Sequence, residues 1–147
     1  MKKNDLWNMI KSGQGVETDF YSYSFTASSI AAAASAVSTI SIQSNAAFVI
    51  VKSCYMASVA NATLTDSTRV VPLINVAITD NGSGRNLQNT AVPINSIAGV
   101  GELPFVWPQQ RILMPSSSVQ CTFTNVSAAT TYTTVTLTLF GYQVFIL

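Results

Sequence analysis

The sequence contains no histidine and few charged residues. Aspartate, glutamate, lysine and arginine make up 9% of its 147 residues, whereas ordinary soluble domains contain roughly 25%. Without imidazole, the usual Ser-His-acid and Cys-His catalytic arrangements and histidine-bound transition metals are excluded. We expect a protein that is not an enzyme and has no cofactor or metal. The six acidic residues are also too scattered to indicate a catalytic carboxylate pair: Asp5, Glu17, Asp19, Asp66, Asp80 and Glu102.

Positive charge is equally sparse. Seven basic residues and six acidic residues give a net charge of +1. The basic residues are scattered, so they do not predict a stripe that could follow a phosphate backbone, and we expect no nucleic-acid partner. A net charge this close to zero gives little repulsion between copies, which favours a homo-oligomer or a larger assembly.

Cysteine is limited to Cys54 and Cys121. Neither residue belongs to a CxxC pair, so the spacing argues against a zinc site. Cys121 lies between Val119 and Phe123 at strand spacing, which favours a buried and inert thiol. The sequence leaves open whether the two cysteines form a disulfide.

Two long segments, residues 20–51 and 112–147, contain no Asp, Glu, Lys or Arg. The first is longer than the roughly 20 residues of a transmembrane helix. However, serine, threonine and glutamine recur in it at short intervals, and a helix in lipid would expose them. We therefore expect hydroxyl-rich strands that pack against other protein, and a membrane-associated role is the weaker alternative.

Residues 1–19 are predicted to form an extended or short-helical N-terminal arm, followed by one domain over residues 20–147. The arm holds six of the thirteen charges and ends in a break at Gly13–Gly15. A short apolar helical face is not stable alone, so it either docks on a partner surface or belongs to a frayed tail. The candidate interface residues on this face are Leu6, Trp7, Met9 and Ile10.

From Phe20 the apolar period changes to two, which is the period of strands with one face inward. Residues 46–51 are apolar on both faces, as in a strand that is covered on two sides. In the final third, threonines alternate with Val135, Leu137 and Leu139, and this composition suits a half-buried pleated surface. The fold class predicted is all-β: an antiparallel, jelly-roll-like β-sandwich of about eight strands.

Two local features of this predicted sandwich are open. The alanine-rich residues 27–36 favour a helix by propensity but also suit a strand or connector. Gly141 is expected to bulge or bend the last strand.

The segment Thr79–Arg85 combines Asp, Asn and two glycines between strand-like runs, which predicts a tight turn. Asp80 resembles one ligand of a calcium loop, but the further carboxylates of such a loop are missing. We expect Asp80 and Arg85 to anchor this loop, with Arg85 binding a carboxylate or a backbone carbonyl.

A second candidate interface lies in the sequence LPFVWP, at Phe105 and Trp107. The flanking prolines place these aromatic residues near a corner or loop, where they would be exposed unless a partner covers them. Burial in the core of the sandwich is the alternative.

Three motifs between residues 74 and 145, about half of the chain, resemble small β-sandwich virion structural proteins of tailed bacteriophages. They are the turn ITD-x-GSGR, the stretch G-x-G-x-x-PF-x-x-P and the closing strand L-x-G-Y. The resemblance implies an auxiliary, cement or decoration protein bound to the head shell, and it implies no catalytic residues.

The function predicted is thus that of a capsid decoration or cement protein in the virion, assembled in the host cytoplasm. Its expected partners are further copies of itself and the major capsid protein, with the head shell stabilised by clamping of neighbouring subunits. The main alternative is a tail- or fibre-associated module that binds carbohydrate or a receptor, since β-sandwiches also carry such sites.

Overall fold

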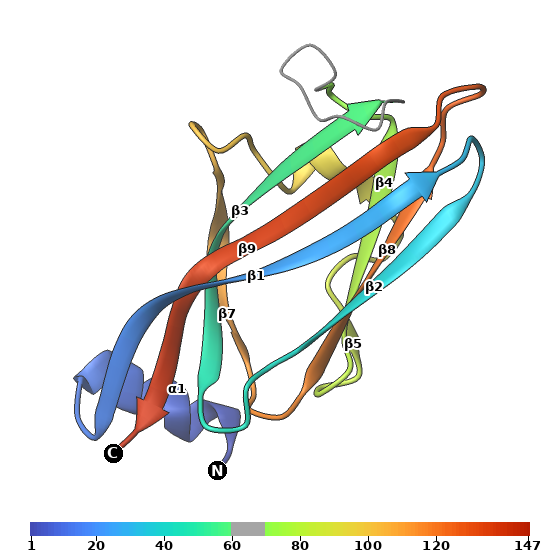
Figure 1. The fold of residues 1–147 in the computed structure, drawn as a ribbon. Helices are drawn as coiled ribbons and strands as arrows, with labels where there is room; N and C mark the ends of the chain where they lie inside the picture. The colour runs from blue at the N-terminus through green and yellow to red at the C-terminus, as the bar shows by residue number, and fades with distance from the viewer. Residues whose placement is uncertain (60–69) are drawn as a thin grey trace.

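The computed structural model describes residues 1–59 and 70–147, which form two packed β-sheets with a short N-terminal helix (Figure 1). All pairings between its strands are antiparallel. Within the described residues, no helix has the length and apolar character needed to cross a membrane. The elements are α1 (Lys3–Ser12), β1 (Val16–Ile30), β2 (Ser35–Ser41), β3 (Ala47–Val59), β4 (Ile74–Asp80), β5 (Arg85–Asn86), β6 (Val92–Pro93), the 3-10 helix η2 (Ile94–Ser96), β7 (Phe105–Leu113), β8 (Ser118–Asn125) and β9 (Tyr132–Ile146).

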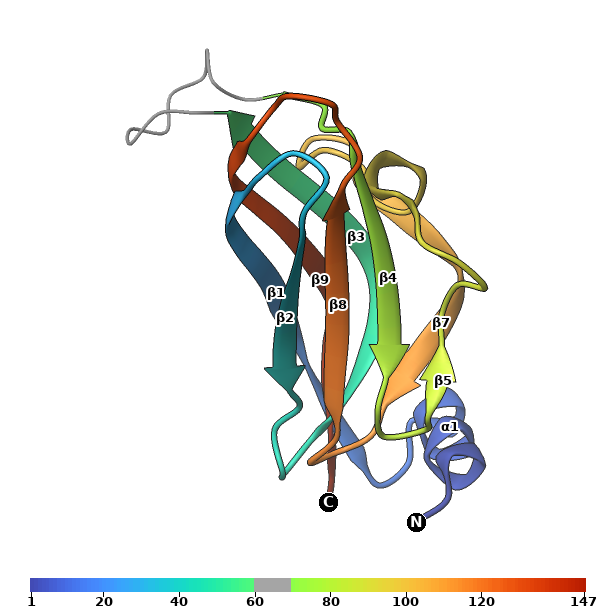
Figure 2. The ribbon, with the colours of Figure 1, turned by 90° about the vertical axis from the view of Figure 1, so that its right-hand side faces the viewer.

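The strand order is that of a jelly roll. The first sheet has the order β1-β9-β3-β7, and the second sheet has the order β2-β8-β4-β5, with β6 also paired to β4. Figure 2 shows β2, β8 and β4 lying in front of β1, β9 and β3. Successive long strands therefore alternate between the layers, and the last two strands insert between earlier ones, as in two Greek keys. The predicted antiparallel, jelly-roll-like sandwich is confirmed.

The core lies between the two sheets, where the alternating residues of each strand meet. In β9, Val135, Leu137 and Leu139 are fully buried, while the threonines between them are half-buried on the other face. Cys121 and Phe123 of β8 are also fully buried in this core. The period of two in the final third of the sequence thus identified the inward faces of both sheets correctly.

Strand β3 is covered on both faces at its start, as its apolar sequence predicted. Phe48 and Ile50 enter the core between the sheets, whereas Ala47 and Val49 belong to a second cluster between the first sheet and α1. A register shift between Ile50 and Lys52 then changes which residues face outward.

This shift lies opposite Gly141, so the extra residue belongs to β3, and the bulge expected in the last strand at Gly141 is in its neighbour instead. A Cβ atom on Gly141 would lie 1.7 Å from the carbonyl oxygen of Val49. Only glycine permits two backbones to approach this closely.

Residues 27–36 are neither one helix nor one strand. They contain the end of β1, a turn and the start of β2, with Ala33 in the left-handed region at φ 59°. Helix propensity is overridden here because the ends of β1 and β2 pair with β9 and β8 respectively.

The two cysteines are free thiols in different layers of the fold. Cys121 is fully buried in the core from the second sheet, while Cys54 is half-buried on β3 of the first sheet. The question left open by the sequence is therefore answered: the two residues do not form a disulfide.

Candidate functional site: a cationic and aromatic cleft beside the N-terminal helix

Helix α1 packs across the lower end of the first sheet. Leu6 is fully buried against Ala47, Val49, Ile112 and Val144, which come from β3, β7 and β9. Its burial contributes roughly 1.5–3 kcal/mol. Figure 1 shows the helix beside the lower ends of β1 and β9.

The apolar face predicted for the arm is therefore mainly an internal contact. Leu6 has no surface to offer a partner, and Ile10 is half-buried beside the same cluster. Met9 is half-buried near Gly15, at the turn into β1. The strand β1 begins at Val16, earlier than Phe20, where the sequence period first indicated a strand. Trp7 also packs on the cluster, and in addition it lines a cleft beside the helix.

This cleft has a volume of about 550 Å³ and is bounded by α1, β5 and β7. Such a volume is within the range of ligand-binding pockets. It brings together four of the sequence-predicted site residues, Trp7, Arg85, Phe105 and Trp107. The remaining lining residues are Lys3, Asn4, Leu87, Gln88, Ile97, Pro108, Gln109, Gln110, Arg111 and Ile112.

Trp107 is fixed at the cleft by a hydrogen bond as well as by packing. Its indole Nε1 donates to Ser53 Oγ at 3.0 Å, and the buried Ser53 hydroxyl donates in turn to the carbonyl of Ile97. Trp107 and Phe105 are both half-buried, so each presents part of its ring to the cleft. The sequence left open whether the aromatic residues of LPFVWP are exposed or buried. Each ring is partly buried and partly exposed at the cleft.

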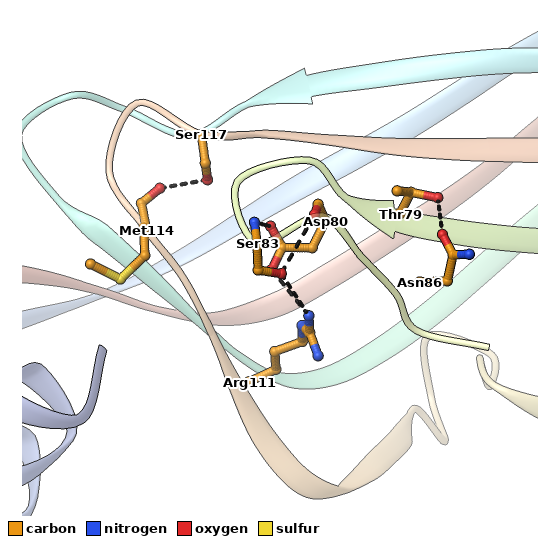
Figure 3. Close-up of polar contacts among 7 residues, drawn as sticks. All are labelled: Thr79, Asp80, Ser83, Asn86, Arg111, Met114 and Ser117. Carbon is orange, nitrogen blue, oxygen red and sulfur yellow. Dashed lines mark hydrogen bonds and ion pairs between the residues drawn. The ribbon is translucent and has the colours of Figure 1, made fainter. Parts of the chain in front are cut away.

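Asp80 anchors the turn after β4, but its cationic partner is Arg111 (Figure 3). Arg111 Nη2 lies 3.1 Å from Asp80 Oδ2, and Ser83 donates to the same carboxylate through Oγ at 2.7 Å. Asp80 is 2% exposed, so this network satisfies a nearly buried charge.

The expectation that Arg85 anchors this turn is wrong. Arg85 meets Asp80 only as its neighbour in the β4–β5 ladder, and its side chain makes no hydrogen bond or ion pair within the described residues. Because Arg85 is exposed and lines the cleft, its charge is available to a ligand. The anchoring arginine lies on β7, far from Asp80 in sequence, so no local pattern could have identified it.

The cleft carries an excess of positive charge. The pKa of Lys3 is lowered, first by partial burial and then by the positive charges of Arg111 and Arg85, while Asp80 acts in the opposite direction. Burial alone would raise the pKa of Asp80, but hydrogen bonds from Ser83 and Arg111, together with the Arg111 charge, lower it. The positive charges of Arg111 and Arg85 therefore act on Lys3 together with the negative charge of the buried Asp80 carboxylate.

These lining residues are suited to binding. Three cations can attract an anionic group, the aromatic rings offer apolar surface, and three glutamines can hydrogen-bond to amides or hydroxyls. Sequence reasoning missed Lys3 and the glutamines, because only the docking of α1 beside β7 places them together.

Comparison with known proteins assigns no family to this chain. No protein-family model matches it, and no curated protein sequence matches it. Among solved structures, it is similar to the atomic structure of Sulfolobus Turreted Icosahedral Virus, with 16% identity, a TM-score of 0.40 and coverage of 88% of this chain and 30% of that chain.

Two further structures are similar with lower TM-scores. The subviral particle of infectious bursal disease virus VP2 is 8% identical, with a TM-score of 0.34 and coverage of 91% of this chain and 38% of that chain. An exo-beta-1,3-galactanase from Phanerochaete chrysosporium is 17% identical, with a TM-score of 0.32 and coverage of 81% of this chain and 29% of that chain. The chain thus spans about a third of each of these proteins, and similarity of this extent assigns no function.

Proposed function

We propose that this chain is a non-enzymatic structural protein of a virus particle, which forms oligomers and decorates or cements the head shell of a tailed bacteriophage. The observation that supports this role is the near absence of charge on the outward faces of both sheets. Such faces are suited to contact with neighbouring protein subunits.

On the second sheet, the outward residues of β2, β8 and β4 alternate with buried ones and are uncharged. Hydroxyl groups link adjacent strands on this face, as in the 3.0 Å contact between Ser35 and Thr124. The outward residues are Ser35, Val37, Thr39, Ser41, Ser118, Gln120, Thr122, Thr124, Asn75, Ala77 and Thr79.

The first sheet repeats this pattern on its outward face. Ser24 and Thr138 are linked at 2.9 Å, and within the described strands Lys52 is the one charged residue on this face, whereas Glu17 and Asp19 of β1 are exposed on the opposite face. Phe20 is 76% exposed and stacks on Phe140, with 6.4 Å between the ring centroids. An exposed aromatic pair beside uncharged hydroxyl rows is a surface that a partner would cover.

The size of the chain permits several such contacts. A standard stable interface buries about 800 Å² per partner, and the accessible surface of this chain is 7799 Å². One face could bind a second copy while another binds the major capsid protein.

The direct test is cryo-electron microscopy of purified particles produced from the genome that encodes this chain. We expect density for this jelly roll on the head shell, in contact with major capsid subunits. Absence of the chain from purified particles would overturn the proposal, and density only on the tail would transfer the role to that structure.

A release assay on the same particles tests the type of contact. Because the outward faces are nearly uncharged and the chain has no histidine, attachment should resist both raised salt and acidification to about pH 6. Release by modest salt alone would contradict contact through these faces.

A carbohydrate- or receptor-binding module of a tail or fibre is the second candidate. It is favoured by the cleft, where Trp7 and Trp107 lie beside glutamine side chains. A glycan array with the isolated protein tests this role, using Trp107→Ala as the variant that should lose binding. A liposome flotation assay tests the membrane-associated role separately.

A further inference from the structure

Positive charge is concentrated at one place on this sparsely charged chain. Three of the six lysines and arginines within the described residues line the cleft, namely Lys3, Arg85 and Arg111. Among the described residues, Asp80 is the carboxylate that opposes them there, and it already binds Arg111 and Ser83. Asp5, the acidic residue of α1, accepts a hydrogen bond from the backbone of Lys2 and does not line the cleft.

A complementary segment lies at the opposite edge of the first sheet. Residues Glu17 to Phe20 belong to β1, which is the edge strand farthest from β7 in this sheet. Glu17 and Asp19 are exposed on one face of this strand, and Phe20 is 76% exposed on the other, so an approach along the strand edge meets all three. As part of an edge strand, this segment also has backbone groups on its outer side that pair with no other described strand.

The helix explains why these two surfaces lie on opposite flanks. Its ten residues span about 15 Å, close to the width of a four-stranded sheet with strands about 4.8 Å apart. Its N-terminal residues Lys3 and Asn4 line the cleft beside β7, while its C-terminal end leads through Gly13 into β1.

We propose that the cleft binds the Glu17–Phe20 segment of a second copy of this chain. The two acids pair with Lys3 and Arg85, Phe20 packs against the tryptophan rings, and the glutamines hydrogen-bond to the free edge of β1. Both the charges and the apolar groups of the two surfaces are complementary.

The contact joins different surfaces of the two copies, so it is head-to-tail. Repetition of such a contact generates a ring or a chain of subunits. The inference rests on the proposed assembly role, but it concerns contact between copies and not attachment to the shell. The two ideas also differ in salt dependence: self-association through charged groups is weakened by salt, whereas attachment through the uncharged faces is not.

The test is sedimentation velocity of the full chain, with intrinsic fluorescence as a second measurement. Both tryptophans of the chain line the cleft, so their emission reports directly on its occupancy. We expect wild-type protein to associate at about 0.01 M salt and to dissociate at about 1 M salt, where the Debye length falls from about 30 Å to about 3 Å.

Charge reversal identifies the two surfaces. The double variant Lys3→Glu with Arg85→Glu, and separately the double variant Glu17→Lys with Asp19→Lys, should each weaken association by about tenfold or more. An equimolar mixture of the two variants should recover association and the fluorescence change, because every contact between unlike variants then joins opposite charges. Lys52→Glu and Glu102→Lys are the matched controls, since both residues are exposed and lie outside the two surfaces.

Three outcomes would overturn the inference. These are a wild-type protein that stays monomeric at low salt, cleft and edge variants that associate as well as the controls, and a mixture that does not recover association. If the wild-type protein is monomeric but an acidic peptide alters its tryptophan emission, the cleft serves a foreign anionic partner. In each of these cases, attachment of the chain to particles can still be found, so the two proposals fail separately. Circular dichroism of each variant checks that the sandwich remains folded.

Discussion

Arg111 on β7 and Asp80 at the end of β4 connect the two sheets of the sandwich, with 3.1 Å between Nη2 and Oδ2. Arg111 of this pair also lines the cleft. The side chain of Asp80 is only 4% exposed and that of Arg111 is 22% exposed, so solvent screens the contact weakly on the acidic side. Arg111 therefore contributes both to the contact between the sheets and to the wall of the cleft.

Replacing Asp80 by asparagine should destabilise the protein by about 2 kcal/mol, because Arg111 then loses its charged partner while the size of the side chain is kept. Urea unfolding followed by circular dichroism measures this change. Arg85→Ala is the matched control, since the exposed Arg85 side chain makes no ion pair within the described residues, and its effect should stay within about 0.5 kcal/mol. Equal effects of the two substitutions would show that the turn is not anchored by this pair.

The Asp80 contribution should depend on pH in a defined direction. Because the folded-state pKa of Asp80 is lowered, its stabilising effect is present above the unfolded value of about 3.9 and is lost as the pH falls through the lower folded value. The stability difference between wild type and Asp80→Asn should therefore shrink below about pH 4. Unfolding curves at a series of pH values test this, and a difference that grows on acidification would contradict it.

The sequence predicted the architecture well because the sandwich depends on alternation, which is a local property. The inward residues of β8 and β9 were identified from the period of two, and the double coverage of β3 followed from its apolar run. The start of β1 at Val16 was missed because Glu17 and Asp19 do not resemble a half-buried strand. Pairing with β9 holds these charged residues in extended conformation.

The cleft was predictable only in parts. Trp7, Phe105 and Trp107 were identified as candidates because large aromatic residues on short or proline-flanked segments need cover. They meet in one cleft because Leu6 packs against the outer face of the first sheet. This contact joins residues far apart in the sequence, so no local spacing predicts it. That Asp80 pairs with Arg111 and not with Arg85 has the same origin, since the packing of the two sheets, and not proximity in the chain, brings β7 close to β4.

Leu6→Ala should detach α1 from the first sheet. The residue is fully buried, and its truncation is expected to cost about 3 kcal/mol. Hydrogen exchange should show faster exchange for the α1 amides, and tryptophan emission should shift to longer wavelength as Trp7 becomes exposed. Asn8→Ala, on the exposed side of the same helix, should leave both measurements unchanged. Full protection of the α1 amides in Leu6→Ala would mean that the helix does not depend on this contact.

Gly141→Ala should be strongly destabilising because the added methyl group would lie 1.7 Å from the Val49 carbonyl oxygen. The backbones of β3 and β9 must separate to admit it, so we expect a loss of about 3 kcal/mol or more. Gly101→Ala is the control, since a Cβ atom there meets no other atom within 4 Å. Thermal unfolding compares the two variants. Similar midpoints for both would contradict the close approach of β3 and β9.

The two thiols should differ in reactivity towards an alkylating reagent. Burial raises the pKa of Cys121 to about 12, so the native protein holds it as a neutral, inaccessible thiol, whereas Cys54 is half-buried. Thiolate is the reactive form, and we expect mass spectrometry to find modification first at Cys54, with Cys121 modified only when the sandwich unfolds. Since the folded pKa of Cys121 exceeds the unfolded value of about 8.5, its burial also makes the protein lose stability as the pH rises above about 9. Cys54→Ser should remove the early modification without exposing Cys121, and labelling of Cys121 in native Cys54→Ser would show that the core between the sheets opens without global unfolding.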